Sequence, residues 1–77
     1  MNGTLKYVSL SEQVYNYLRM QMNQGEILPG STINIGELAT QLGISKTPLR
    51  DALMQLELEG FVTILPRKGV KVNVLGI

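Results

Sequence analysis

The chain has 77 residues, of which 44% are apolar and 17% charged, and its net charge is +1. This length accommodates a single domain, and the apolar share is too high for a disordered chain. Cysteine and histidine are absent, which excludes disulfides, zinc sites of the Cys/His type and histidine-activated nucleophiles. The apolar runs are too short to predict a membrane-spanning segment or a signal peptide.

The first predicted helix begins at Ser9. The sequence Ser-Leu-Ser-Glu that starts there matches a capping box, in which the serine hydroxyl accepts from an amide of the first turn. Apolar residues then recur on one face, at Leu10, Val14, Tyr17 and Leu18. We therefore expect Tyr17 in the core and Arg19 on the opposite, polar face. Gly25 is expected to end the helix.

The second predicted helix follows a linker that contains the turn pair Pro29-Gly30 and a candidate strand of one or two residues at Ile33. It opens with another capping box, from Asn34 to Glu37. Its apolar face is Ile35, Leu38, Ala39 and Leu42. The three residues 43–45 then form a glycine-containing break, which is typical of a helix-turn-helix.

The third predicted helix runs from a Ser45 cap to about Glu59. Its buried stripe is Leu49, Ala52, Leu53 and Leu56. Beyond it the apolar period changes to two, which predicts strands at 61–65 and 70–74 joined by a turn. The fold class is therefore mainly α with a small β-hairpin, a winged helix-turn-helix of three helices plus a two-stranded wing. We expect this domain to occupy residues 9–75, preceded by a flexible N-terminal arm at residues 1–8.

Basic residues gather where the third helix begins. Lys46 occupies the first helical position and Arg50 lies just past the first turn, where the helix dipole disfavours cations unless an anion is bound. Pro48 offers no N–H, so Ser45 can cap only Thr47. Such a helix start, with open amides and neighbouring cations, is typical of phosphate binding. The simpler interpretation is a plain N-cap at Ser45.

Helical projection places four side chains on the face away from the buried stripe, and we expect them to be able to enter a DNA major groove while Ser45 and Lys46 engage its edge: Thr47, Arg50, Asp51 and Met54. The alternative for Arg50 is a surface ion pair with Asp51 or Glu57. Met54 and Leu58 also point outward, and we expect them to pack against the wing or an adjoining domain rather than to contact bases.

A second basic cluster lies in the predicted wing, at Arg67, Lys68, Gly69 and Lys71. A basic hairpin tip reaches phosphates, and a glycine permits close approach of the backbone to a minor groove. The alternative is a turn that is basic only for solubility.

No catalytic arrangement emerges from the sequence. Glu57 and Glu59 are two residues apart on a helix and do not face each other, and the glycines of residues 25–30 lack the lysine and hydroxyl of a phosphate loop. We therefore expect neither an enzyme nor a bound cofactor or metal. The two functions that remain are binding of double-stranded DNA and, as the alternative, a winged-helix protein-interaction module without DNA binding.

Several stretches resemble the DNA-binding domain of GntR-type bacterial transcription regulators. The most specific is Leu-Gly-Ile-Ser-Lys-Thr-Pro-Leu-Arg-Asp-Ala-Leu at 42–53, accompanied by Glu-Gly-Phe-Val at 59–62 and Pro-Arg-Lys-Gly-Val-Lys-Val at 66–72. The resemblance implies DNA contacts at Ser45, Lys46, Thr47, Pro48, Arg50 and Gly69. It also implies contact or capping roles for Glu37 and Thr47.

The same resemblance implies a cytoplasmic regulator, usually a metabolite-responsive repressor, that binds palindromic operators as a homodimer. Family members carry a C-terminal effector and dimerisation domain, which we expect to lie outside this chain. They most often have arginine where this chain has Lys46. Lysine lacks the two-pronged guanidinium that reads guanine, so phosphate contact is the expected role of Lys46.

Overall fold

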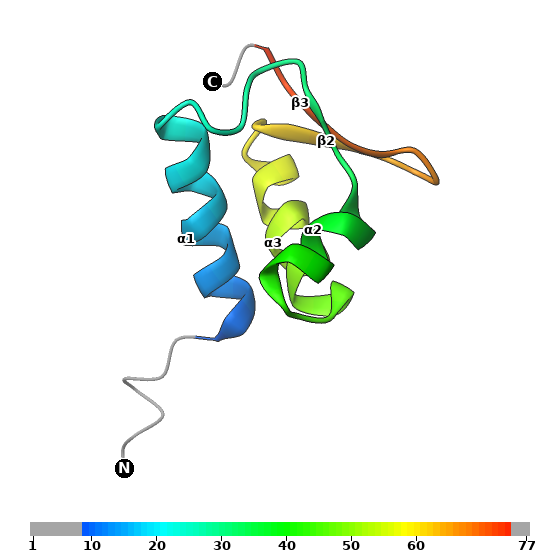
Figure 1. The fold of residues 1–77 in the computed structure, drawn as a ribbon. Coiled ribbons are helices and arrows are strands. Elements are labelled where there is room, and N and C mark those ends of the chain that lie inside the picture. The colour runs from blue at the N-terminus through cyan, green and yellow to red at the C-terminus, as the bar shows by residue number, and fades with distance from the viewer. Residues whose placement is uncertain (1–8, 75–77) are drawn as a thin grey trace.

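The computed structural model describes residues 9–74, so the predicted arm at 1–8 and position 75 lie outside the described residues. Three helices are followed by a hairpin (Figure 1). The elements are α1 (Leu10–Asn23), β1 (Thr32–Ile33), α2 (Ile35–Leu42), α3 (Lys46–Leu58), β2 (Val62–Leu65) and β3 (Gly69–Val72). In the described part of the chain, no helix is long and apolar enough to cross a membrane.

The starts of α1 and α2 are capped as predicted. The Ser9 hydroxyl accepts from the Glu12 N–H at 3.2 Å, and Oδ1 of Asn34 accepts from the Glu37 N–H at 2.9 Å. Each bond satisfies one amide that has no partner within its helix.

The start of α3 differs. Ser45 takes the extended conformation of an N-cap residue, but its side chain makes no capping hydrogen bond. The prediction that Ser45 caps through its hydroxyl is therefore wrong. Pro48 occupies the third helical position and has no N–H, so one of the two usual donors to a cap is missing. The first turn of α3 consequently keeps amides without a side-chain acceptor from this cap.

The core lies where α1, α3 and the hairpin meet, with α1 and α3 packed beside each other (Figure 1). Its most deeply buried side chains are Leu18, Leu49, Leu53, Leu56, Val62 and Val70. The predicted stripe of α3 is confirmed in full. Tyr17 is 41% exposed, so its predicted place in the core is wrong, and Tyr15 packs against the core instead. The leucine at 18 already fills the space between α1 and α3.

The predicted hairpin forms, and β1 joins it as a third antiparallel strand in the order β1-β3-β2. Thr32 pairs with Lys71 across one side of β3, and Leu65 pairs with Gly69 across the other. Gly69 has φ +103°, and a Cβ atom there would lie 2.7 Å from the carbonyl oxygen of Ile33. A glycine is therefore required for β1 to approach β3 at this point.

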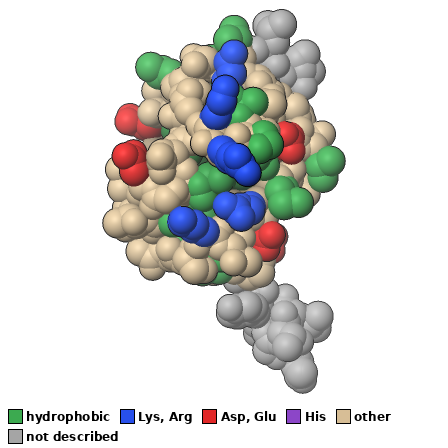
Figure 2. Space-filling view, turned by 90° about the vertical axis from the view of Figure 1, so that its right-hand side faces the viewer, with side chains coloured by type: hydrophobic (Ala, Val, Ile, Leu, Met, Phe, Trp, Pro, Cys, Tyr) green, Lys and Arg blue, Asp and Glu red, His purple; other side chains and the backbone are tan. Residues whose placement is uncertain are grey.

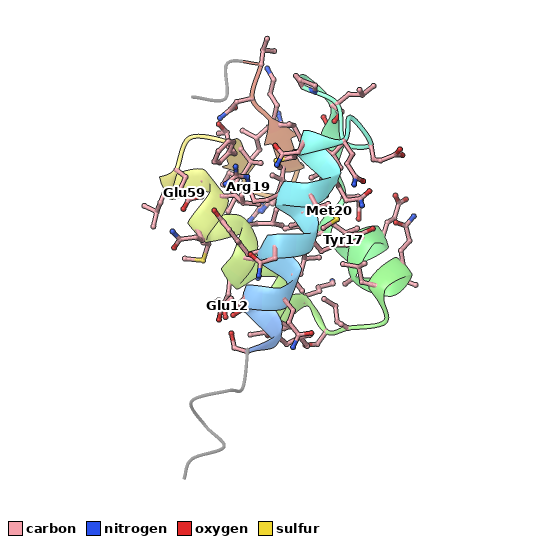
Figure 3. All side chains as sticks on the ribbon, turned by 90° about the vertical axis from the view of Figure 1, so that its left-hand side faces the viewer. Glu12, Tyr17, Arg19, Met20 and Glu59 are labelled. Atoms are coloured by element: carbon pink, nitrogen blue, oxygen red, sulfur yellow. The ribbon has the colours of Figure 1, made fainter. Side chains whose placement is uncertain are left out.

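The sequence predicted Arg19 on the solvated face of α1, and this prediction is wrong. Arg19 is half-buried, its Cζ lies 4.2 Å from the centroid of the Phe61 ring, and its Nη1 donates to the Tyr15 hydroxyl at 3.2 Å. The Tyr15 hydroxyl in turn donates to Glu59 at the end of α3. Arg19 and Glu59 lie on one side of α1 in Figure 3, whereas Tyr17 and Met20 lie on the other. A cation on an aromatic face thus links α1 to the junction of α3 and β2.

Candidate nucleic-acid interface

One face of α3 is exposed, as helical projection predicted. Thr47, Arg50, Asp51 and Met54 all point to solvent because Leu49, Ala52 and Leu53 hold the opposite face in the core. Met54 is 51% exposed and Leu58 is 84% exposed, so neither packs against the wing. With this much of each side chain exposed, the prediction that they pack against the wing is wrong, while packing against an adjoining domain stays a prediction.

The two basic clusters meet at one hollow between the first turn of α2, the start of α3 and the turn of the hairpin. Among the described residues it is lined by Asn34, Ile35, Gly36, Lys46, Arg50, Ile64, Leu65, Pro66, Arg67, Lys68 and Gly69. None of these is acidic. Figure 2 shows Lys and Arg side chains in a row across this face, with acidic side chains toward its edges. We call the hollow, with the basic side chains that line it, the basic face; these side chains are Lys46, Arg50, Arg67 and Lys68.

The cations of α3 have no acidic partner. Within residues 9–74, the side chains of Lys46 and Arg50 make no hydrogen bond or ion pair. The alternative of an ion pair from Arg50 to Asp51 or Glu57 is therefore not formed. Oε2 of Glu57 instead accepts from the backbone N–H of Ile64 at 2.9 Å. The guanidinium of Arg50 is left free to bind an anion or a base edge.

Lys46 lies across the start of α2. A Cβ atom on Gly36 would be 3.8 Å from Cε of Lys46 and 4.0 Å from its Nζ. The ammonium therefore lies close to the N-terminal turns of both α2 and α3, where two helix dipoles present positive charge. An anion at this point would be attracted by the ammonium and by the amides of both turns.

The turn of the wing is tight. The N–H of Lys68 donates to the carbonyl of Leu65 at 2.9 Å, with Pro66 and Arg67 at the two central positions. Pro66 suits the first of these, whereas the second has a positive φ of 65° at Arg67. Both Arg67 and Lys68 are exposed, and neither side chain has a hydrogen bond or ion pair within residues 9–74.

The structure brings five of the predicted site residues to the hollow: Lys46, Arg50, Arg67, Lys68 and Gly69. Four others do not line it. Ser45 and Thr47 are exposed beside the start of α3, Pro48 is half-buried, and Lys71 lies on the exposed side of β3. The close approach of Ile33 by itself explains why position 69 is a glycine. The DNA contact predicted for Gly69 stays a prediction.

Sequence reasoning missed the contribution of α2 to the hollow. Asn34 was expected only as a cap, and Gly36 had no predicted role, yet both line the basic face. Their place depends on how α2 packs beside α3, which the sequence of α2 itself does not indicate. The break at 43–45 was the available signal, because a helix-turn-helix brings its two helices together.

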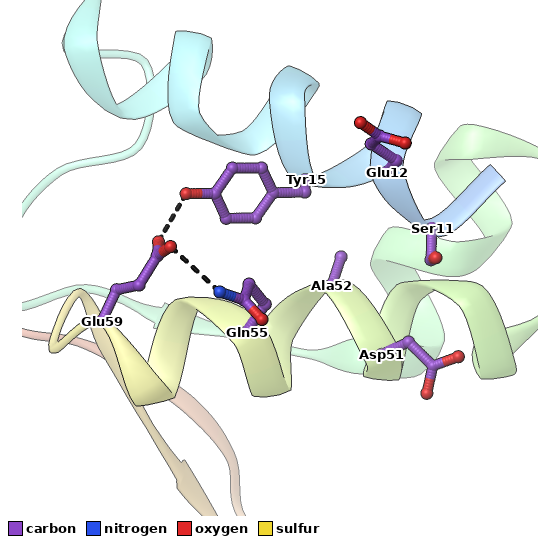
Figure 4. Close-up of a pocket in the computed structure, with 7 residues that line it drawn as sticks. All are labelled: Ser11, Glu12, Tyr15, Asp51, Ala52, Gln55 and Glu59. Carbon is purple, nitrogen blue, oxygen red and sulfur yellow. Dashed lines mark hydrogen bonds between the residues drawn. The ribbon is translucent and has the colours of Figure 1, made fainter. Parts of the chain in front are cut away.

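A second hollow, between α1 and α3, has the opposite charge (Figure 4). It is lined by Ser11, Glu12, Tyr15, Asp51, Ala52, Gln55 and Glu59. Hydrogen bonds from Tyr15 and Gln55 hold the pKa of Glu59 below its usual 4.5. A groove with three carboxylates repels phosphate, so of these two hollows in residues 9–74 the basic face is the one that suits a polyanion.

Residues 10–72 match a family described as bacterial regulatory proteins, gntR family. The HTH-type transcriptional regulator McbR of Escherichia coli is 38% identical over 74 residues, which cover 96% of this chain and 34% of that protein. The Nta operon transcriptional regulator of Aminobacter aminovorans is 53% identical over 47 residues, covering 61% and 22%. The chain thus spans about a third or less of the length of these relatives.

Solved structures agree with this match. The structure of Escherichia coli McbR/YncC has a TM-score of 0.83 at 37% identity, and the match covers 91% of this chain and 33% of that one. The DNA-binding domain of AraR, solved in complex with an operator, has a TM-score of 0.77 at 30% identity. That match covers 86% of this chain and 82% of the AraR domain.

Proposed function

Because the chain belongs to the gntR family of bacterial regulatory proteins, we propose that it is a sequence-specific, double-stranded DNA-binding domain of a transcription regulator. The observation that carries this proposal is the basic face. Four unpaired cations from two distant parts of the sequence, Lys46, Arg50, Arg67 and Lys68, line one hollow without an acidic neighbour in its lining. Such an arrangement is electrostatically unfavourable unless an anion binds there.

The residues have different roles in this proposal. Segment 45–50 at the start of α3 enters the major groove, where Arg50 reads base edges with its two-pronged guanidinium. Lys46 and the open amides near Ser45 and Thr47 bind backbone phosphates. Arg67 and Lys68 reach the minor groove and its phosphates from the wing. Lys71, on the exposed side of β3 and outside the hollow, makes the most peripheral phosphate contact.

For the whole protein we propose a metabolite-responsive regulator that binds a palindromic operator as a homodimer in the bacterial cytoplasm. The AraR structures with operator DNA and the name of the transcriptional repressor RspR of Escherichia coli, a relative 30% identical over 64 residues, support operator binding and repression. In this proposal metabolite sensing and dimerisation lie in a C-terminal domain outside these 77 residues, which cover 34% of McbR. A single domain holds one half-site, so its binding is weak compared with that of a linked pair.

One observation favours the alternative of a protein-interaction module. Leu58 is 84% exposed and Met54 51% exposed on α3, so an apolar partner has a surface to contact. Such a partner would bind with little dependence on salt. Phosphate binding by lysine and arginine instead releases counterions and weakens steeply as salt rises.

A fluorescence titration of labelled duplex DNA with the 77-residue chain at several salt concentrations distinguishes DNA binding from protein interaction. We expect the logarithm of the binding constant to fall linearly with the logarithm of salt concentration, with a slope that corresponds to about four cations brought to the DNA. Replacing Lys68 with Ala should lower that slope by about one unit, and Lys71→Ala, the matched control, should lower it less. Absence of duplex binding at low salt would overturn the proposal.

A further inference from the structure

Arg67 has an unusual backbone conformation for its residue type. Among residues 9–74 it is the only residue other than glycine with a positive φ, at 65°. It occupies the second central position of the turn that the Lys68 N–H closes on Leu65. Turns of this geometry favour glycine or asparagine there, because a Cβ atom is crowded when φ is positive.

The requirement for an arginine does not come from the fold. The Arg67 side chain is exposed and has no hydrogen bond or ion pair within residues 9–74, so no polar contact of the arginine holds the described fold together. Glycine or asparagine would hold the same turn with less strain. Strained residues of this kind gather where a side chain must be aimed at a ligand.

The chemistry of the side chain indicates which ligand feature it meets. A guanidinium is planar and weakly hydrated, so it gives up less hydration free energy than an ammonium when it enters a narrow groove. Runs of A·T pairs narrow the minor groove and strengthen its negative potential, which attracts arginine. Lys68, next along the turn, carries a compact and strongly hydrated charge that suits a phosphate.

We propose that Arg67 determines specificity by inserting into a narrow, A·T-rich minor groove beside the major-groove segment contacted by α3. This inference rests on the proposed DNA-binding function. It adds a feature of the operator that α3 alone does not read, namely a preference for A·T pairs at a position where the protein makes no base-edge contact from the major groove.

The test is a selection of duplexes from a random-sequence DNA library by the 77-residue chain and three variants. Arg67→Asn keeps a residue that tolerates the turn, Arg67→Lys keeps the charge, and Lys68→Gln removes the neighbouring charge as a control. We expect the wild-type chain to enrich an A·T-rich segment next to the sequence read by α3. The A·T preference should fall about tenfold in Arg67→Asn, the size of a base-pair mismatch, and partly in Arg67→Lys.

Lys68→Gln should bind more weakly with its A·T preference unchanged. Circular dichroism of each variant checks that the fold is kept. Selection of a sequence motif whose A·T segment is the same in wild type and Arg67→Asn would overturn the role of Arg67 while leaving DNA binding intact. Failure of the wild-type chain to enrich any duplex would instead overturn the proposed function itself, so the two failures are distinct.

Discussion

The ammonium of Lys46 lies against Gly36, with Nζ 4.0 Å from the position that a Cβ atom on Gly36 would occupy. This contact joins the first residue of α3 to the first turn of α2. It gathers a cation and the positive ends of two helices at one point of the basic face. We propose that a DNA phosphate completes this arrangement. A Cβ atom at position 36 would still leave room for the ammonium, whereas a large side chain there would displace it.

The first prediction concerns position 36. Replacing Gly36 with Leu should displace Lys46 and weaken duplex binding by about as much as Lys46→Ala, with a salt slope lower by about one unit. The double variant should bind no more weakly than either single one. Gly36→Ala is the matched control, because its Cβ makes ordinary contacts of 3.4 Å or more. Additive losses in the double variant would show that Gly36 does not position Lys46.

The second prediction concerns Arg50. Its guanidinium is unpaired within residues 9–74, so Arg50→Ala removes no contact inside the described fold. We expect binding to a selected operator to weaken by about 1–3 kcal/mol and the discrimination between operator and unrelated duplex to shrink. Arg50→Lys should restore the affinity for unrelated duplex but not the discrimination between operator and unrelated duplex. Lysine keeps the charge but lacks the two-pronged guanidinium that reads a base edge. Titrations of both duplexes at one salt concentration measure this, and an unchanged ratio in Arg50→Ala would contradict the role.

The third prediction compares two glycines. Gly69 and Gly25 both have positive φ, but a Cβ at Gly69 would lie 2.7 Å from the carbonyl oxygen of Ile33, whereas nothing lies within 4 Å at Gly25. Gly25→Ala should cost about 1 kcal/mol of unfolding free energy through backbone strain alone. Gly69→Ala should cost clearly more, because β1 must also move away from β3. Urea unfolding of the two variants tests this, and equal losses would show that β1 does not constrain the wing.

The fourth prediction concerns pH. Hydrogen bonds from Tyr15 and Gln55 lower the pKa of Glu59 in the folded chain below its ordinary value of 4.5. A lowered folded pKa stabilises the fold above the unfolded pKa, and this contribution is lost as pH falls through the folded pKa. The free energy of unfolding should therefore decrease as the pH is lowered below about 4.5. The decrease should be smaller in Tyr15→Phe and in Glu59→Gln. Urea unfolding at neutral pH and below 4.5 measures this, and the same drop in all three chains would exclude Glu59 as its source.

Most of the fold could be predicted from sequence because its determinants are local. Capping at Ser9 and Asn34, the apolar spacing of α3 and the alternation of valines in β3 are each set within a few residues. The stacking of Arg19 on Phe61 could not be predicted in this way, because it joins residues 42 positions apart in the chain. Periodicity alone placed Arg19 with the polar residues.

The site was predicted in its parts but not in its assembly. The sequence identified Arg50 and Lys68 as members of two basic clusters, and the packing of α3 against the hairpin brings both to one hollow. Gly36 carries no chemical signal of its own, and its role follows only from the approach of Lys46. Pro48 removes one donor to Ser45 and can be read from the sequence, whereas the absence of a hydrogen bond from the remaining donor depends on the detailed geometry of one helical turn.

In the proposed complex, segment 45–50 and the wing tip contact duplex DNA together. The most direct measurement is a nuclear magnetic resonance titration of the isotope-labelled chain with a duplex, following backbone and arginine side-chain signals. Our account predicts the largest shifts at Lys46, Thr47, Arg50, Arg67 and Lys68, with Glu12 and Glu59 in the acidic groove nearly unchanged. Shifts concentrated at Met54 and Leu58, with the start of α3 and the wing unaffected, would contradict it.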